Sequence, residues 1–319
     1  MKTIEFTSTL ADKMSHFVKL KQHSGSNYFN SAKLLCRFDH YLTTLSFKDK
    51  VLTRSIFQEY FKKINHLCSR GFSNHYSVLQ QFSVWLNQYQ TDSFVLEKQR
   101  AIDRSYSRSA YIFSMYEIEA ILKNSCGMTT REEWLPGLYQ TLFGLLYSTG
   151  IRIGEALSLN YTDYIKEKKL IYIRQAKFRK ERYLVLSNST ASRLNNYAVS
   201  YKKAKLPPSD ESPLFLNTRT RRLTYNSAYL AFTKTLKKAG INKNSNGPRL
   251  HDFRHTFAVH RLLQWYKGQQ NVNAKLPLLS TYMGHVDITS TQIYLESASE
   301  LLQAGNERFA NFFVTHIKK

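Results

Sequence analysis

Apolar side chains in the first hundred residues recur at three- and four-residue steps, the spacing that places them on one face of a helix. Ala32, Leu35, Phe38 and Leu42 show this spacing most clearly. Polar breaks rich in Ser, Asn and charged residues separate such segments. The pattern predicts four helices with one apolar face each, over about residues 10–20, 28–42, 52–64 and 76–89, with breaks at 24–27, 46–50 and 69–74.

Residues 94–110 have no sustained hydrophobic period and are polar and basic, which predicts a linker between two domains. Beyond it, Ser114 and Glu117 have the spacing of a capping box ahead of apolar positions. An apolar helix over about 135–147 stops at Gly150, a residue suited to ending a helix. Further helices are predicted at about 225–239, at 253–266, around 276–278 after a loop over 265–273, and near the C-terminus.

Two β-rich runs, residues 170–173 and 183–186, flank the charged stretch 177–182 and predict a hairpin with a basic tip. The expected fold class is therefore mainly α with a small β-sheet. The length of 319 residues agrees with more than one domain. We expect a helical domain over 1–93, the linker over 94–110 and a second domain over 111–319.

The charge balance points to a polyanionic partner. Lysine and arginine number 46 against 23 aspartates and glutamates, a formal net charge of +23, and nucleic acid is the simplest partner for such a surplus. An anionic membrane is the alternative, but no apolar run is long enough to span a bilayer and no signal-like segment opens the chain, so a cytoplasmic protein is expected. The cysteines Cys36, Cys68 and Cys126 form no C-x-x-C pair, which disfavours disulfides and cysteine-based zinc sites.

Four short motifs in the second domain carry side chains suited to phosphate chemistry. Arg152 follows Gly150 at the start of a helix, where free backbone N–H groups favour anions. His251 and Arg254 are three residues apart and share one helical face. Taken singly each match is weak, because surface arginines, solvated lysines and packed histidines are common. In chain order the set is Arg152, Lys177, His251, Arg254, His285 and Tyr294.

This order, with its surrounding residues, resembles the tyrosine recombinase, or phage integrase, family of DNA strand-exchange enzymes. The resemblance covers residues 114–296, the stretch 265–285 is most similar to transposon-borne integrases, and the helical first domain with its linker is similar to the family's core-binding domain. It implies a two-domain clamp on double-stranded DNA that cuts and rejoins strands through a 3′-phosphotyrosyl link. It also implies dimers or tetramers on DNA, accessory DNA-bending proteins as further partners, and association with the nucleoid.

The residue types agree with such chemistry. Two guanidinium groups can hold the non-bridging oxygens of a phosphodiester at any working pH, a role that fits Arg152 and Arg254. A tyrosine hydroxyl can attack phosphorus and conserve the bond as an ester, which fits Tyr294 as the nucleophile. A lysine on a hairpin can protonate the leaving 5′ oxygen, which fits Lys177 as the general acid.

The two remaining site residues are histidines. His251 and His285 can hydrogen-bond the phosphate, and either can help to deprotonate the tyrosine, although the resemblance favours His251 as the base. No cofactor or metal is expected, because the arginines replace the cation and the sequence has neither a zinc or magnesium ligand set nor a Walker-type phosphate loop. The other histidines of the region, such as His255 and His260, are expected to be packed or at the surface.

Some positions depart from the family pattern. Glycines often flank the hairpin lysine in relatives, whereas this chain has Ala176 and Phe178, so Lys180 is a second candidate for the general acid. Glu155 is expected to buttress the first arginine. Two other functions stay open, a type IB topoisomerase-like nicking-closing enzyme and a catalytically inactive DNA-binding protein of the same fold. The apolar C-terminal segment is expected to form an interaction helix that packs on its own domain or docks into a neighbouring protomer.

Overall fold

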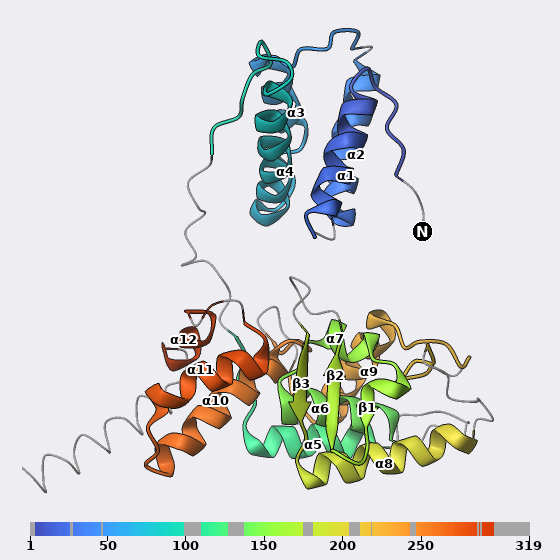
Figure 1. The fold of residues 1–319 in the computed structure, drawn as a ribbon, viewed down its shortest axis with the longest axis vertical. Helices are drawn as coiled ribbons and strands as arrows, with labels where there is room; N and C mark the ends of the chain where they lie inside the picture. The colour runs from blue at the N-terminus through green and yellow to red at the C-terminus, as the bar shows by residue number, and fades with distance from the viewer. Residues whose placement is uncertain are drawn as a thin grey trace, which may run out of the picture. The chain divides into compact units, whose positions relative to one another are not determined.

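The computed structural model divides the chain into two compact units, Met1–Ser107 and Arg108–Lys319 (Figure 1). None of the helices that it describes combines the length and the apolar character needed to cross a bilayer. Lys177 and Lys180, and the predicted C-terminal interaction helix, lie outside the described residues. The described residues are 4–25, 28–45, 47–98, 110–126, 137–174, 181–203, 211–217, 219–242, 247–285, 287 and 289–296.

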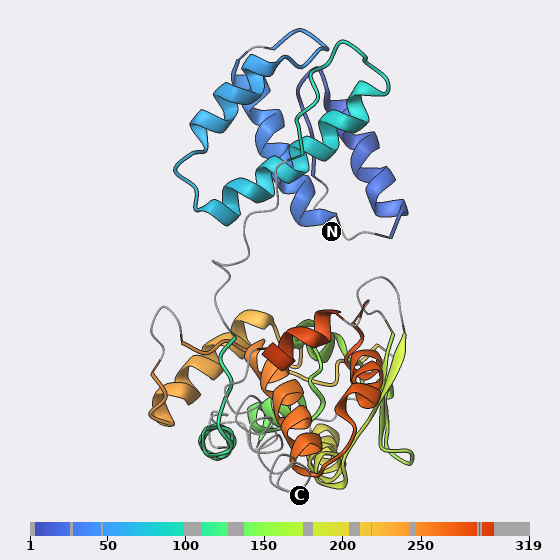
Figure 2. The ribbon, with the colours of Figure 1, turned by 90° about the vertical axis from the view of Figure 1, so that its left-hand side faces the viewer.

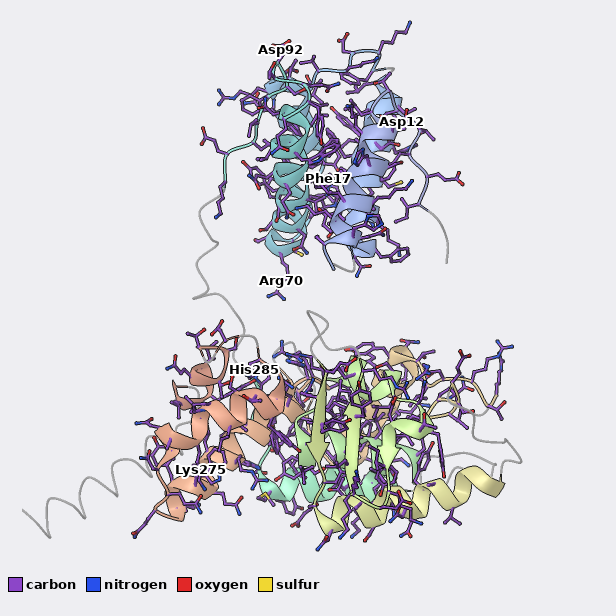
Figure 3. The ribbon with its side chains drawn as sticks, in the orientation of Figure 1. Asp12, Phe17, Arg70, Asp92, Lys275 and His285 are labelled. Carbon is purple, nitrogen blue, oxygen red and sulfur yellow. The ribbon has the colours of Figure 1, made fainter. Side chains whose placement is uncertain are left out.

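Four helices form the first unit, and their apolar faces meet in one core. Phe17 contacts Phe82 with ring centroids 5.4 Å apart, and Phe38 stacks on Phe57 at 5.5 Å. All four rings are buried, and Phe17 is labelled in this interior in Figure 3. Each buried aromatic ring removes a large apolar area from water, which helps to stabilise so small a unit. The helices are α1 (Ala11–His23), α2 (Phe29–Thr44), α3 (Arg54–Lys63) and α4 (Ser69–Asn87).

Three of these helices confirm the predicted segments, but the predicted break at 69–74 is wrong. Helix α4 begins at Ser69, within a run of residues that are poor helix formers. Tertiary contacts explain the extra turns. Phe72 packs on Phe61 with centroids 5.4 Å apart, and Nδ1 of His75 lies 3.0 Å from the Tyr60 hydroxyl in the buried core. Packing of the first turns therefore outweighs their weak intrinsic propensity.

Residues at the start of the predicted linker also belong to the first unit. The backbone N–H of Phe94 donates to the carbonyl of Leu52 at 2.7 Å, and Leu96 is buried in the core. Residues 99–109 lie outside the described ranges.

A three-stranded antiparallel sheet lies at one side of the second unit (Figure 2). The hairpin prediction is confirmed, with Ile173 opposite Arg182 across the two long strands. Ile171, Ile173 and Leu184 face the core, whereas Tyr183 and Val185 are exposed on the other face. This alternation is the period-two pattern of a sheet with one buried face. The strands are β1 (Tyr164–Ile165), β2 (Leu170–Ile173) and β3 (Arg182–Val185).

Helices build the rest of the second unit around stacked aromatic rings. Phe253 lies 5.1 Å from Phe113 and 5.8 Å from Phe143 between ring centroids. The helices are α5 (Met115–Ser125), α6 (Leu138–Thr149), α7 (Ile153–Ser158), α8 (Asn188–Lys203), α9 (Tyr225–Lys238), α10 (Asp252–Lys267), α11 (Val272–Met283) and α12 (Thr289–Glu296), with a 3₁₀ turn at Tyr161–Asp163. Helix α10 contacts α6, α11 and α12, the elements that meet at the candidate site.

Several local predictions for this unit are confirmed, one is wrong, and one helix was not predicted. Gly150 ends α6 in the left-handed region, as expected. The predicted loop over 265–273 shortens to a few residues, because α10 runs to Lys267 and α11 already begins at Val272. There the Asn271 side chain accepts a hydrogen bond from the N–H of Ala274 at 3.1 Å. Helix α8 was not predicted, because its sequence combines Ser, Asn and Thr with few apolar residues.

The predicted capping box of α5 is present and allows a quantitative test. The Ser114 hydroxyl accepts from the N–H of Glu117 at 3.2 Å, and the Glu117 carboxylate accepts from the N–H of Ser114 at 2.8 Å. Ser114→Ala should lower the free energy of unfolding by about 1 kcal/mol, because an N–H at the helix start loses its acceptor. Urea unfolding of the full chain measures it. Ser114→Thr keeps an acceptor and should lose much less, so equal losses would contradict the capping role.

Candidate active site

The turn between α6 and α7 sets the first catalytic candidate in place. Gly150 has φ +62°, and a Cβ at this residue would lie 2.4 Å from the Phe257 ring, so only glycine fits without rearrangement. Two residues later Arg152 stands at the start of α7. The carbonyl of Gly150 accepts a 2.7 Å hydrogen bond from Nη1 of Arg254 on α10. One turn therefore positions both arginines.

Arg254 is buried, with 2% of its surface exposed. Its other terminal nitrogen, Nη2, donates to the carbonyl of Met283 at 2.8 Å, so two backbone oxygens hold the guanidinium. Burial, followed by the neighbouring charge of Arg152, lowers the pKa of Arg254 to about 10. That value is still far above neutrality, so the group keeps its positive charge at working pH.

Arg152 shares a carboxylate with Arg182, the first residue of β3. Nη1 of Arg152 donates to Oε1 of Glu155 at 2.8 Å, and Nη2 donates to the carbonyl of Gly284 at 3.0 Å. Arg182 contacts both oxygens of Glu155, at 3.2 and 2.7 Å. Burial alone raises the pKa of Glu155, but the hydrogen bonds and charges of Arg182 and Arg152 outweigh it and hold the pKa below its usual range. The predicted buttressing role of Glu155 agrees with these contacts.

Tyr294 lies on α12 with 4% of its surface exposed. Burial raises the pKa of the Tyr294 hydroxyl, while the charge and hydrogen bonding of Arg254, and the charge of Arg152, act in the opposite direction. Because those cations favour the phenolate, they partly offset the cost of ionising a buried hydroxyl.

His285 lies on the turn that joins α11 to α12, where Figure 3 labels it. Its ring stacks on that of Tyr294 with centroids 6.1 Å apart. Its Nδ1 lies 2.7 Å from the hydroxyl of the buried Thr291, which fixes the orientation of the ring. Burial, then the charge of Arg254, lowers the pKa of His285 to about 4.

His255 is packed, as expected, but the rings that it packs against belong to the site. Its ring meets that of Tyr294 edge to face at 5.4 Å and that of His251 at 5.0 Å. Desolvation, then the charge of Arg254, lowers the pKa of His251. Part of the surface of His251 remains exposed to solvent. Desolvation, then His251, lowers the pKa of His255 to about 4. His260 does pack as expected, with Nδ1 lying 3.0 Å from the Tyr147 hydroxyl.

The structure thus brings five of the six predicted residues together, and Lys177 falls in the segment 175–180 that it does not describe. Arg182 and His255 are the two residues that the sequence reasoning missed. Arg182 was assigned to the basic hairpin tip, but it lies two residues before Leu184 in β3, and period two places both on the inner face. His255 is four residues after His251, and the spacing rule that joined His251 to Arg254 also applies to this pair.

The sequence model of the phage integrase family matches residues 113–300. The chain belongs to the phage integrase family of tyrosine recombinases. A relative across nearly the whole chain is the candidate integrase/recombinase y4rE of Sinorhizobium fredii, 30% identical over 305 residues, with 95% of this chain and 96% of the relative covered. The tyrosine recombinase XerD of Corynebacterium glutamicum is 32% identical over 164 residues, about half of each chain.

Solved structures of the family share the fold of this recombinase. The XerH site-specific recombinase, determined bound to its difH substrate, matches with a TM-score of 0.64 at 20% identity, covering 94% of this chain and 84% of that one. The Tn1549 transposon integrase, determined with a circular intermediate DNA, matches with a TM-score of 0.63 at 18% identity, covering 93% and 98%. The mainly helical fold class with a small sheet is thereby confirmed.

The shared carboxylate of Glu155 allows a pH-dependent test of this recombinase. The folded pKa of Glu155 lies below the unfolded value of about 4.3, so the ionised carboxylate stabilises the fold above that pH. This contribution is lost as the pH falls through the folded pKa. Glu155→Gln should cost about 3 kcal/mol at pH 7, because two largely buried guanidinium groups lose their partner.

Urea unfolding of both proteins across the acid range measures the difference. The difference in the free energy of unfolding between the wild type and Glu155→Gln should stay constant from pH 7 to about 5. It should decrease only below the pKa of the carboxylate in the unfolded chain, about 4.3. Glu119→Gln, at an exposed position of α5, is the matched control and should change little at any pH. A Glu155 difference that is already small at pH 7 would contradict the bridging role.

Proposed function

We propose that this recombinase cuts and rejoins double-stranded DNA at specific sites, with Tyr294 as the nucleophile. The observation that carries the proposal is the convergence of a buried tyrosine with the cations Arg152 and Arg254. Attack of the Tyr294 hydroxyl oxygen on phosphorus forms a 3′-phosphotyrosyl ester and breaks the bond to the 5′ oxygen. The leaving 5′ oxygen takes a proton from Lys177 and departs as a 5′ hydroxyl. Attack by a 5′ hydroxyl of another strand then reverses the step and frees the tyrosine.

The site supplies electrostatic stabilisation where charge develops. Arg152 and Arg254 are proposed to hold the non-bridging oxygens, and preorganised cations in a partly desolvated site stabilise the transition state more than they would in water. His251 and His285, with lowered pKa values, are neutral at working pH. A neutral imidazole can donate a hydrogen bond to the phosphate and also accept the tyrosine proton, and His251 is the proposed base.

The alternatives are weaker. A type IB topoisomerase-like nicking-closing enzyme is not favoured, because the relatives of this chain are integrases and Xer recombinases. A catalytically inactive DNA-binding protein is also disfavoured, since Arg254 is buried, hydrogen-bonds Tyr294, and acts together with the charge of Arg152 on its hydroxyl.

The partners are proposed on the same basis. The structural neighbours were determined with DNA, and the net charge of +23 suits a polyanion. We propose that the first unit, in which Phe94 and Leu96 join the predicted domain over 1–93, binds DNA as a core-binding domain, that the rest of 94–110 acts as the linker, and that 111–319 carry out the chemistry. Dimers or tetramers form on paired sites, with accessory DNA-bending proteins, and action on such DNA would put the protein at the nucleoid in the cytoplasm.

Tyr294→Phe tests the nucleophile. The variant should form no covalent adduct on a suicide DNA substrate and should still bind DNA, because only a hydroxyl is removed. Denaturing gels score the adduct and a mobility shift scores binding. Tyr225→Phe, at an exposed tyrosine of α9, is the matched control and should form the adduct normally. Covalent cleavage by pure Tyr294→Phe protein would refute the assignment.

A leaving-group test separates Lys177 from Lys180. A 5′-bridging sulfur in the scissile phosphate departs without a proton. Lys177→Ala should therefore be slow on normal DNA and largely restored on the sulfur substrate, because general acid catalysis is no longer needed. Single-turnover cleavage rates measure the rescue. Rescue of Lys180→Ala alone would move the general acid three residues along the hairpin.

Deletion of the residues after Ser299 tests the assembly. If the C-terminal segment docks into a neighbouring protomer, the shortened protein should bind a single site but fail to pair two sites or recombine. Gel shifts on one- and two-site DNA measure this. Aggregation of the shortened protein would assign the segment to its own domain, and normal recombination would rule out the docking.

A further inference from the structure

Arg182 uses all three guanidinium nitrogens inside the second unit. Nη1 and Nη2 donate to the two oxygens of Glu155 at 3.2 and 2.7 Å, and Nε donates to the carbonyl of Tyr282 at 3.1 Å. Only 10% of the side chain is exposed. A two-pronged contact of this kind fixes orientation as well as distance, because the planar group matches both carboxylate oxygens.

The turn after α11 lies directly against the same guanidinium. Gly284 has φ +68°, and a Cβ at this residue would lie 2.8 Å from Nη1 of Arg182. The absent side chain therefore lets the backbone approach the planar group closely. The carbonyl of Gly284 is also the acceptor for Nη2 of Arg152 at 3.0 Å.

Arg152 is consequently held by two groups, and Arg182 contacts both. One is the Glu155 carboxylate, at 2.8 Å from Nη1 of Arg152, and the other is the Gly284 turn. A guanidinium has five N–H donors, and these contacts use two of those on Arg152, whose side chain remains 26% exposed. The remaining donors are left for a substrate oxyanion. Without Arg182, the buried Glu155 would keep one partner instead of two, and the Tyr282 carbonyl would lose its donor, although the Tyr282 hydroxyl would still donate to the Val185 carbonyl of β3 at 3.0 Å.

We propose that Arg182 is a positioning residue for Arg152. It acts through Glu155 and the Tyr282–Gly284 turn and does not itself touch the phosphate. Because Arg182 is the first residue of β3, its contacts also join the start of this strand to Glu155, which binds Arg152. The inference rests on the proposed role of Arg152 in cleavage, so the experiment below separates the two.

The test is a double-mutant comparison in single-turnover cleavage of a suicide DNA substrate at saturating protein. Arg182→Gln should slow adduct formation on the order of 10- to 100-fold, the effect of displacing a catalytic group by up to about 1 Å. DNA affinity should stay close to wild type. Arg152→Ala combined with Arg182→Gln should be no slower than Arg152→Ala alone, because a residue that acts through Arg152 has nothing left to position.

A second variant and a control distinguish the loss of positioning from the loss of a charge or of the fold. Arg182→Lys keeps the charge beside Glu155 but cannot reach both carboxylate oxygens and the Tyr282 carbonyl together, so it should remain slow in the wild-type background and silent in the Arg152→Ala background. Arg221→Gln removes the same charge from an exposed position and should cleave normally. Thermal unfolding checks that each variant is folded.

Each other outcome overturns a specific statement. Full activity of Arg182→Lys would show that Arg182 does not position Arg152. The same conclusion would follow if Arg182→Gln slowed cleavage by the same factor in the Arg152→Ala background as in the wild type. Wild-type cleavage by Arg152→Ala would instead overturn the proposed role of Arg152 in the reaction.

Discussion

A buried guanidinium at Arg254 is the constraint on which the rest of the second unit depends. A charge removed from water needs compensating groups, and here they are the carbonyls of Gly150 and Met283. Gly150 caps the C-terminal end of α6, and Met283 is the last residue of α11. The C-terminal ends of helices carry unpaired carbonyls and partial negative charge, so two such ends stabilise one cation. In doing so they bring together the two turns that carry the other site residues.

The electrostatics of the site follow from this arrangement. Arg152, Arg182 and Arg254 face one buried carboxylate, so positive charge is in excess before any substrate binds. Desolvation, aided by nearby positive charge, keeps the histidines of the site neutral. An incoming phosphodiester would supply the missing negative charge, and neutral imidazoles would not add to the repulsion among the arginines. The same excess favours the phenolate of Tyr294 at the moment of attack.

The local contacts also show how strongly the site depends on backbone conformation. Both Gly150 and Gly284 have positive φ, and in both cases a side chain would collide with a group that builds the site, the Phe257 ring or the Arg182 guanidinium. The two glycines therefore do more than end helices. They allow backbone and guanidinium groups to approach at distances that no other residue permits.

Short-range patterns were enough to predict much of this protein. Hydrophobic periodicity located most helices, the Ser114 and Gly150 signals located two helix ends, and β-rich runs located the hairpin, because each depends on neighbours a few residues away. The order of motif residues identified the family and most of the site. Tertiary structure alone decided the rest. The first turns of α4 form because Phe72 and His75 find distant partners. Period two already places Arg182 on the inner face of the sheet, but its partner Glu155 lies on another element and is brought to it only by the tertiary fold.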